Sequence, residues 1–165
     1  MDAGRLRRER LRRRYRPAEV RLLFIGESPP ASGRFFYQGD SGLYRAMRNT
    51  FRAAFPSTTD ADFLPTFQKA GCYLIDVCQQ PVDHLDRASR RAACLAGEAL
   101  LSRRIRKLWP RTIVTVVRSI GANVARAASH AGWHGPLIDL PYPGRWVRHQ
   151  EIFLAQLVPI LRAHL

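Results

Sequence analysis

The stretch that decides the fold runs from residue 21 to residue 30 and reads Arg21-Leu22-Leu23-Phe24-Ile25-Gly26-Glu27-Ser28-Pro29-Pro30. Its apolar part suits a buried β-strand, because strands that are covered on both faces read as continuous apolar runs. The run stops at Gly26, and a carboxylate and a hydroxyl follow on a proline-stiffened turn. Open parallel sheets bind ligands outside the carboxyl ends of their strands, so this turn is either a candidate site or a plain connector.

Three further apolar runs and the helical patterns between them predict an α/β fold. Strands are predicted within residues 71–82, at 112–117 and at 137–140, and helices at 43–55, 62–69 (a short turn), 87–108, 121–131 and from 149 onward. Strands that alternate with helices imply parallel pairing, right-handed crossovers and helices on both faces. We therefore predict a three-layer α/β/α sandwich around a central four-stranded parallel sheet, formed by residues 19–165.

Two helices carry more specific expectations. The buried face of the long helix at 87–108 is expected to hold Ala92, Leu95, Ala99 and Leu108. Pro159 is expected to bend or split the last helix, because proline lacks the N–H that a helix needs.

The composition suits one domain with a full core. The chain has 165 residues, of which 46% are hydrophobic. No apolar run is long enough to cross a bilayer and no signal peptide is evident, so we expect a cytoplasmic protein without membrane contact, and a monomer. Three cysteines without a CxxC spacing argue against a disulfide framework or a zinc site. The scattered histidines fit surface or capping positions, so neither metal nor cofactor is expected; these are His84, His130, His134 and His164.

The charge is the strongest global signal. The formal net charge is +14, and nearly all the basic residues are arginine. Such a field favours nucleic acid or another polyanion, and the guanidinium fork pairs well with phosphate. A general compositional bias toward arginine is the alternative. Residues 1–18 form the most basic segment, which we expect to be either a helix that lies on phosphate or a partly disordered arm.

Polar side chains follow each predicted strand and should meet at one edge of the sheet. They are Glu27, Ser28, Asp76, Arg118, Ser119, Tyr142, Arg145, Trp146, Arg148 and His149. Asp76 at the end of an apolar run needs partners or a cavity, unless it only caps a turn. The loop at 31–42 adds three consecutive aromatic residues, either buried anchors or a surface on which a base can stack. Glycine patterns of dinucleotide and phosphate-binding loops are absent.

This pattern resembles the uracil-DNA glycosylase superfamily over roughly residues 20 to 160. Gly26-Glu27-Ser28-Pro29 is similar to the family's first motif, Gly-x-x-Pro, in its Gly-Glu-x-Pro variant. Gly33-Arg34-Phe35-Phe36 is similar to the Gly-Arg-x-Phe of the bacterial iron–sulfur branch, whose Phe stacks on uracil. Tyr73-Leu74-Ile75-Asp76 resembles the second strand, which in the family ends in a base-reading Asn. Leu140-Pro141-Tyr142-Pro143 and the following residues 144–150 stand where the family has His-Pro-Ser and its intercalating loop.

The resemblance implies roles for particular residues. Glu27 would stabilise the oxocarbenium-like cation or orient the attacking water, and His149 or a nearby arginine would stabilise the departing base. The base would be held by Gly26, Ser28, Phe36 and Asp76. DNA contacts would come from Arg34, Arg118, Ser119, Tyr142, Arg145, Trp146 and Arg148, with Arg145-Trp146 wedging into the duplex. The family implies excision of uracil or another deaminated base from single- or double-stranded DNA.

The sequence also departs from the family. Leu140 stands in place of the usual catalytic His, Ser28 in place of a common Asp or Asn, and Asp76 in place of the Asn. Three cysteines cannot supply the four thiolates of an iron–sulfur cluster, so no cluster is expected. Two other functions stay open: a non-enzymatic nucleic-acid-binding protein of the same fold, and a small-molecule enzyme acting on nucleosides, against which the high positive charge argues.

Overall fold

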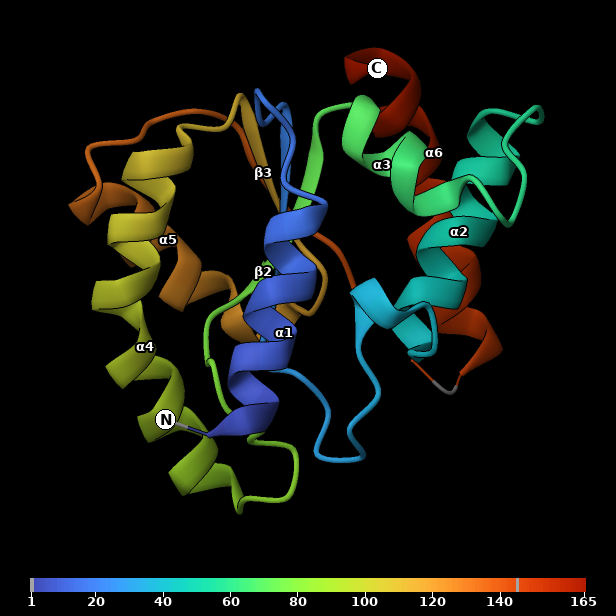
Figure 1. The fold of residues 1–165 in the computed structure, drawn as a ribbon. Coiled ribbons are helices and arrows are strands. Elements are labelled where there is room, and N and C mark those ends of the chain that lie inside the picture. The colour runs from blue at the N-terminus through green and yellow to red at the C-terminus, as the bar shows by residue number, and fades with distance from the viewer. Residues whose placement is uncertain (1, 145) are drawn as a thin grey trace.

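Four parallel strands form the centre of the molecule (Figure 1). This computed structural model describes residues 2–144 and 146–165. The strands are β1 (Leu22–Gly26), β2 (Cys72–Asp76), β3 (Thr112–Thr115) and β4 (Leu137–Asp139), in the order β2-β1-β3-β4. Every pair in the sheet is parallel. The predicted four-stranded parallel sheet is therefore confirmed.

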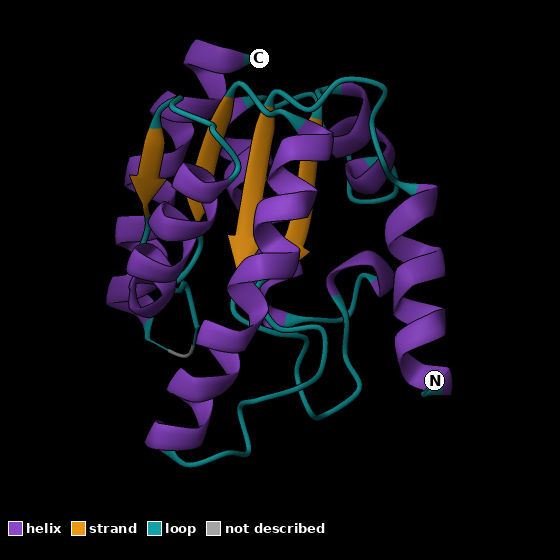
Figure 2. Cartoon of the chain, turned by 90° about the vertical axis from the view of Figure 1, so that its left-hand side faces the viewer, coloured by secondary structure: helices purple, strands orange, loops and turns teal. Residues whose placement is uncertain are grey.

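Helices flank both faces of this sheet. They are α1 (Ala3–Arg14), α2 (Gly42–Ala54), α3 (Phe63–Lys69), α4 (Arg87–Leu108), α5 (Gly121–His130) and α6 (Val147–His164), with short 3-10 turns at Phe36–Gln38 and Arg118–Ile120. Helices α4 and α5 cover one face, α2, α3 and α6 cover the other, and α1 lies along the β2 edge (Figures 1 and 2). This arrangement is compatible with the predicted three-layer sandwich.

Strand β1 is the most completely covered element. Its residues from Leu22 to Ile25 have no exposed surface, because β2 and β3 pair with it on either side and helices cover its two faces. Full burial of one such apolar side chain contributes about 1.5–3 kcal/mol. The apolar run in the sequence thus predicts a central strand correctly.

Aromatic rings fill the space between the sheet and helices α2 and α3. The rings of Phe51 and Phe63 have centroids 5.3 Å apart, and Phe67 packs at 5.6 Å from Phe51 and at 5.7 Å from Phe24 of β1. Phe36 joins the same cluster, 5.3 Å from Phe67. Tilted and edge-on contacts of this kind stabilise a core beyond simple area burial.

The expected buried face of α4 is wrong. Ala92, Leu95 and Ala99 are exposed and Leu108 is half-buried. The buried residues are instead Cys94, Glu98, Leu101, Ser102 and Ile105. Apolar residues occur all round this helix, so their spacing does not show which side of the helix faces the core. Gly97 fixes it, because a Cβ there would lie 2.6 Å from the carbonyl oxygen of Val77, and α4 therefore passes close to the chain after β2.

Pro159 does not split the last helix, so that alternative is wrong. Helix α6 continues from Val147 to His164 with Pro159 inside it. Proline removes the hydrogen bond to the carbonyl of Ala155. Both Pro159 and Ala155 are exposed, so water can satisfy that carbonyl. None of the helices in the described ranges is long and apolar enough to cross a membrane.

The basic N-terminal segment is a helix rather than a disordered arm. Asp2 caps α1 by accepting a hydrogen bond from the Gly4 N–H. The helix has few apolar residues, and Leu6 is half exposed. Its end at the N-terminus lies beside the carboxyl ends of the strands, and the C-terminus of the chain lies at the opposite end of the molecule (Figure 1).

A polar contact joins α4 to α5. Glu98 accepts hydrogen bonds from Asn123 Nδ2 at 2.8 Å and from Arg126 Nη2 at 2.7 Å. The hydrogen bonds from Arg126 hold the pKa of Glu98 below its ordinary value of 4.5. The stabilisation is therefore present above pH 4.5 and is lost as the pH falls through the lowered pKa of the folded state.

We expect Glu98→Gln to lower the free energy of unfolding by about 1 kcal/mol at neutral pH, because a charge-assisted pair becomes a neutral one. The difference from the unmodified protein should shrink as the pH falls below 4.5. Urea unfolding at a series of pH values measures this. A difference that stays constant across that range would contradict the assignment.

Candidate active site

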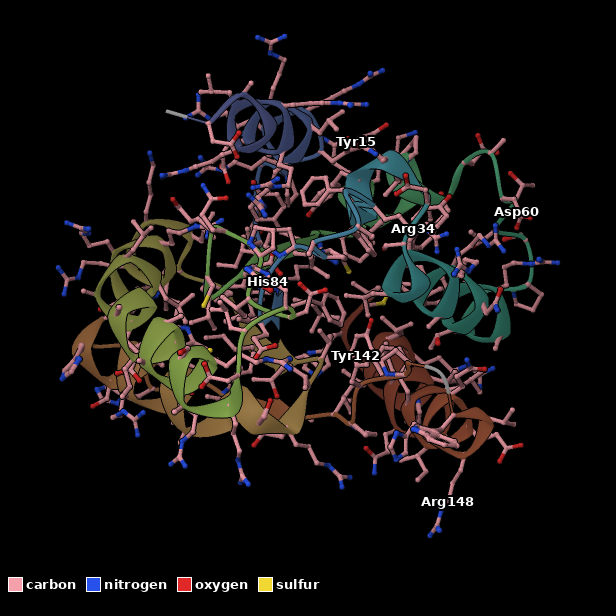
Figure 3. The ribbon with its side chains drawn as sticks, turned by 90° about the horizontal axis from the view of Figure 1, so that it is seen from below. Tyr15, Arg34, Asp60, His84, Tyr142 and Arg148 are labelled. Carbon is pink, nitrogen blue, oxygen red and sulfur yellow. The ribbon has the colours of Figure 1, made fainter. Side chains whose placement is uncertain are left out.

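The carboxyl ends of β1 and β2 bring two carboxylates to one edge of the sheet. The strands end at this edge in Figure 2, and Figure 3 views the molecule from it. Gly26 and Asp76 are register partners at the ends of β1 and β2. A Cβ on Gly26 would lie 2.7 Å from Asp76 Oδ1, so only glycine leaves room for that carboxylate. Glu27 follows directly on β1.

Asp76 is a buried charge with a buried partner. It is 5% exposed, and its Oδ2 accepts a hydrogen bond from Arg12 Nη2 at 3.0 Å. Arg12, from α1, is 4% exposed and also pairs with Glu9 one turn before it. Arg104 of α4 donates to the Asp76 backbone carbonyl at 3.2 Å. Burial raises the pKa of Asp76, and the positive charges of Arg12 and Arg104 oppose that rise.

Glu27 is held in a two-point ion pair with Arg90 of α4. Arg90 Nε donates to Glu27 Oε1 at 3.2 Å, and Nη2 contacts Oε2. The hydrogen bonds to Glu27 raise the pKa of Arg90. Such a fork fixes both the charge and the orientation of the carboxylate. The side chain of Glu27 keeps 15% of its surface exposed, and each carboxylate oxygen can accept a further hydrogen bond.

Two thiols lie beside Glu27. Cys78 Sγ is 3.7 Å from Cys94 Sγ, which is 3.9 Å from Glu27 Oε1. Burial, followed by the neighbouring Cys94, raises the pKa of Cys78 to about 12, and burial also raises the pKa of Cys94. Both thiols are therefore neutral at physiological pH and poor nucleophiles, because thiolate is the reactive form. Reaction through a cysteine is not supported.

The turn after β1 is fixed to the loop after β2. Ser28 Oγ accepts a hydrogen bond from the Val82 N–H at 3.2 Å, and Asp83 accepts one from the Ala31 N–H at 3.0 Å. The hydroxyl and the loop backbone thus hold the two segments together beside Glu27.

The loop after β4 reaches the same edge. His84 and Tyr142 lie near the middle of the view in Figure 3, and both are exposed. Partial burial, with the negative charge of Asp83, raises the pKa of Tyr142. A groove of about 410 Å³ between α2 and α6 adjoins this loop, with Arg45, Gly144 and Gln150 in its lining.

Those of the remaining predicted contact residues that the structure describes are exposed, and they make no hydrogen bond or ion pair with the side chains of Glu27 or Asp76. Arg34 lies in the loop after β1, Arg118 and Ser119 in the turn after β3, and Trp146, Arg148 and His149 at the start of α6. Trp146 is 70% exposed. Arg148 points outward at the rim of the edge (Figure 3). Arg145 lies outside the described residues.

Phe36 does not offer a stacking surface. It is 3% exposed and packs edge-on against Tyr37 and Tyr44, so the buried alternative holds for this ring and its predicted base-stacking role is corrected. Phe35 and Tyr37 are equally buried. Leu140, at the position of the family's His, is 1% exposed.

Sequence reasoning missed the arginines that hold the two carboxylates. Arg90 gives no local signal, because it is one of several arginines near the start of α4. Arg12 is one of many arginines in α1, and only the tertiary structure distinguishes it from its neighbours. The buried aspartate was the one usable signal, since a buried carboxylate requires a cation nearby.

No protein-family model matches this chain, and no curated protein matches it either. Among the described residues, no group of three or more His, Cys, Asp or Glu side chains is arranged to hold a metal ion.

We expect Asp76→Ala to lower the free energy of unfolding by up to about 3 kcal/mol, because it leaves the Arg12 guanidinium buried without its main counter-charge. Undocking of α1 can relieve part of this penalty. Chemical denaturation followed by circular dichroism measures the change.

The double variant Arg12→Met/Asp76→Ala is the matched control. It removes both charges and should recover more than half of the loss, so that the two single effects are strongly non-additive. If the losses of the two single variants simply added up, Arg12 and Asp76 would not stabilise each other, and the ion pair would be contradicted.

Proposed function

We propose that the protein is a DNA glycosylase of the uracil-DNA glycosylase type, which hydrolyses the N-glycosidic bond of uracil or another deaminated base. One observation carries this proposal: Glu27 and Asp76 stand at the ends of neighbouring strands, with Gly26 between them. The net charge of +14 supports a polyanionic substrate. One carboxylate can stabilise the positive charge on the sugar, while the other forms hydrogen bonds to the base.

Glu27 supplies the charge that the reaction needs. As the glycosidic bond breaks, positive charge develops on the sugar, and an ionised carboxylate already fixed in place stabilises it. Arg90 holds Glu27 in a fixed orientation, with its Nε 3.2 Å from Glu27 Oε1. The free acceptor sites of the Glu27 carboxylate can also orient a water for attack on the cation.

Asp76 would read the base as a neutral acid. The uracil edge offers an N–H donor next to a carbonyl acceptor, and an ionised carboxylate has no donor to match it. A carboxylic acid has one donor and one acceptor, as the amide of an Asn does. Burial already raises the pKa of Asp76, which favours the neutral form once Arg12 no longer opposes it.

The positive surface would hold the strand. Arg34, Arg118 and Arg148 are exposed around the edge and suit phosphate contacts. Trp146, 70% exposed, suits a wedge in the base stack. His149, on the first turn of α6, or a nearby arginine is the proposed partner of the departing base. The proposed location is cytoplasmic, and the proposed active form is a monomer.

A nucleic-acid-binding protein without catalysis is the second candidate. Two observations favour it: a buried Leu140 in place of the family's His, and an Asp76 that is already paired with Arg12. Binding and base release must therefore be measured separately.

We expect the protein to release a base from labelled single- or double-stranded oligonucleotides that carry uracil, hypoxanthine, xanthine or mismatched thymine, which alkali then converts into strand breaks. Glu27→Gln should lower the rate of release by about 100-fold or more, because the charge beside the sugar is lost. Glu151→Gln, an exposed carboxylate of α6, is the matched control and should leave the rate unchanged.

The outcomes separate the candidates. Strand breaks that depend on Glu27 support the glycosylase. Salt-sensitive binding without breaks supports the binder, and an absence of both binding and breaks contradicts both proposals.

The pH dependence tests the role of Asp76. A raised pKa means that the neutral acid gains population as the pH falls, so base release should be faster near pH 5 than near pH 8. Asp76→Asn presents the same donor and acceptor at every pH, and its rate should be flatter over this range. An unchanged profile in Asp76→Asn would argue that Asp76 does not contact the base.

A further inference from the structure

The Arg12 guanidinium occupies a slot with the properties of a base site. On one side it lies over the ring of Phe35, with Cζ 5.3 Å from the ring centroid. At its edge it donates to Asp76 at 3.0 Å. Its buried Nε has no hydrogen-bond partner among the described residues. A planar, donor-bearing group between an aromatic face and a carboxyl group is also how a flipped nucleobase is held.

We propose that α1 is a removable plug: Arg12 fills a nucleobase slot between Phe35 and Asp76, and a single nucleic-acid strand that binds the arginines of α1 lifts the helix away. The inference rests on the proposed function for the identity of the slot's ligand. It explains why a residue suited to reading a base is only 5% exposed in the closed form.

Several polar contacts hold α1 against the body of the protein, and Leu11 and Tyr15 also pack against the hydrophobic core. Arg8 Nη2 donates to the Gln79 carbonyl and to Gln80 Oε1, each at 3.2 Å. Gln68 donates to the carbonyls of Arg14 and Arg16 at the other end of the helix. The main aromatic contact is Tyr15 stacked on Tyr37, with centroids 5.7 Å apart. Because polar contacts exchange readily with water, such a helix can separate without opening the core.

A row of arginines faces away from the body. Arg7, Arg10 and Arg14 are exposed, and helical spacing places them along one side of α1. Within the described residues, none of the three has a carboxylate within 4.0 Å. Long side chains of α1 extend away from the molecule in Figure 3. This row suits the phosphates of one strand.

Nucleic acid binds the open form more tightly than the closed form. In the closed form, Arg8 and Arg12 are engaged by the protein. Opening releases Arg8 from the loop after β2 and Arg12 from Asp76, while Glu9 of the same helix stays beside Arg12. An open α1 therefore offers a phosphate backbone more positive charge. A ligand shifts a conformational equilibrium only through such a difference in affinity.

Spin labels can measure the opening directly on the full chain. Leu6 of α1 and Leu95 of α4 are 50% and 56% exposed, so cysteines placed there accept labels. The native cysteines are at most 7% exposed and stay unlabelled. Pulsed electron resonance should show one distance in the free protein. A saturating single-stranded oligonucleotide containing uracil should add a longer distance, and Arg12→Ala should show it without oligonucleotide.

Two substitutions in the same helix should change oligonucleotide affinity in opposite directions. Arg10→Ala removes an outward phosphate contact, so it should weaken binding. The slope of the logarithm of the binding constant against the logarithm of the salt concentration should become shallower by about 0.7. Arg12→Ala removes the closing contact, so it should tighten binding by about two- to tenfold despite the lost charge. Fluorescence anisotropy at several salt concentrations measures both.

The inference is overturned if the oligonucleotide binds while the label distance stays single, or if Arg12→Ala weakens binding as Arg10→Ala does. The distance measurement on the unsubstituted Arg12 protein keeps the test valid even if Arg12→Ala fails to fold. Base release is not needed for either readout. If the protein opens on binding the oligonucleotide but releases no base, the inference about α1 stands and the proposed glycosylase activity is contradicted.

Discussion

The buried ion pair between Arg12 and Asp76 is the constraint on which the site depends. It joins the N-terminal helix to the end of β2, across 64 positions of sequence. Desolvation of both charges is costly, and their attraction repays this only with good geometry and further hydrogen bonds. Glu9 and the ring of Phe35 provide additional contacts to the guanidinium. This interaction helps to fix the position of α1, and it covers the carboxylate of Asp76.

Both carboxylates at this edge are paired with arginine, but the two pairs differ in burial. Arg90 keeps 40% of its side chain exposed, so water screens its contact with Glu27. Arg12 and Asp76 are almost fully buried. Glu27 therefore lies in a screened ion pair close to solvent, and Asp76 lies in a buried ion pair whose cation belongs to α1. Under the proposed function, this difference suits Glu27 to stabilise the charge on the sugar and Asp76 to contact the base.

Sequence patterns predict the sheet well, because β1 is a continuous apolar run and β3 is rich in β-branched residues, as is typical of central strands. The pattern also predicts which edge holds Glu27 and Asp76, since that follows from parallel topology. It does not predict the burial of α4, whose apolar residues lie on all sides and whose direction is set by the close approach of Gly97 to Val77. Nor does it identify Arg12, because a tertiary contact alone separates this arginine from its neighbours in α1.

The most direct test of this account is a crystal structure with a single-stranded oligonucleotide that carries a 2′-fluoro-2′-deoxyuridine, whose glycosidic bond resists hydrolysis. The account predicts the base against Asp76 and over Phe35, Glu27 beside the sugar, and Arg12 displaced from its slot together with α1. A complex in which the strand is bound while Arg12 still pairs with Asp76, and the base lies elsewhere, would contradict it.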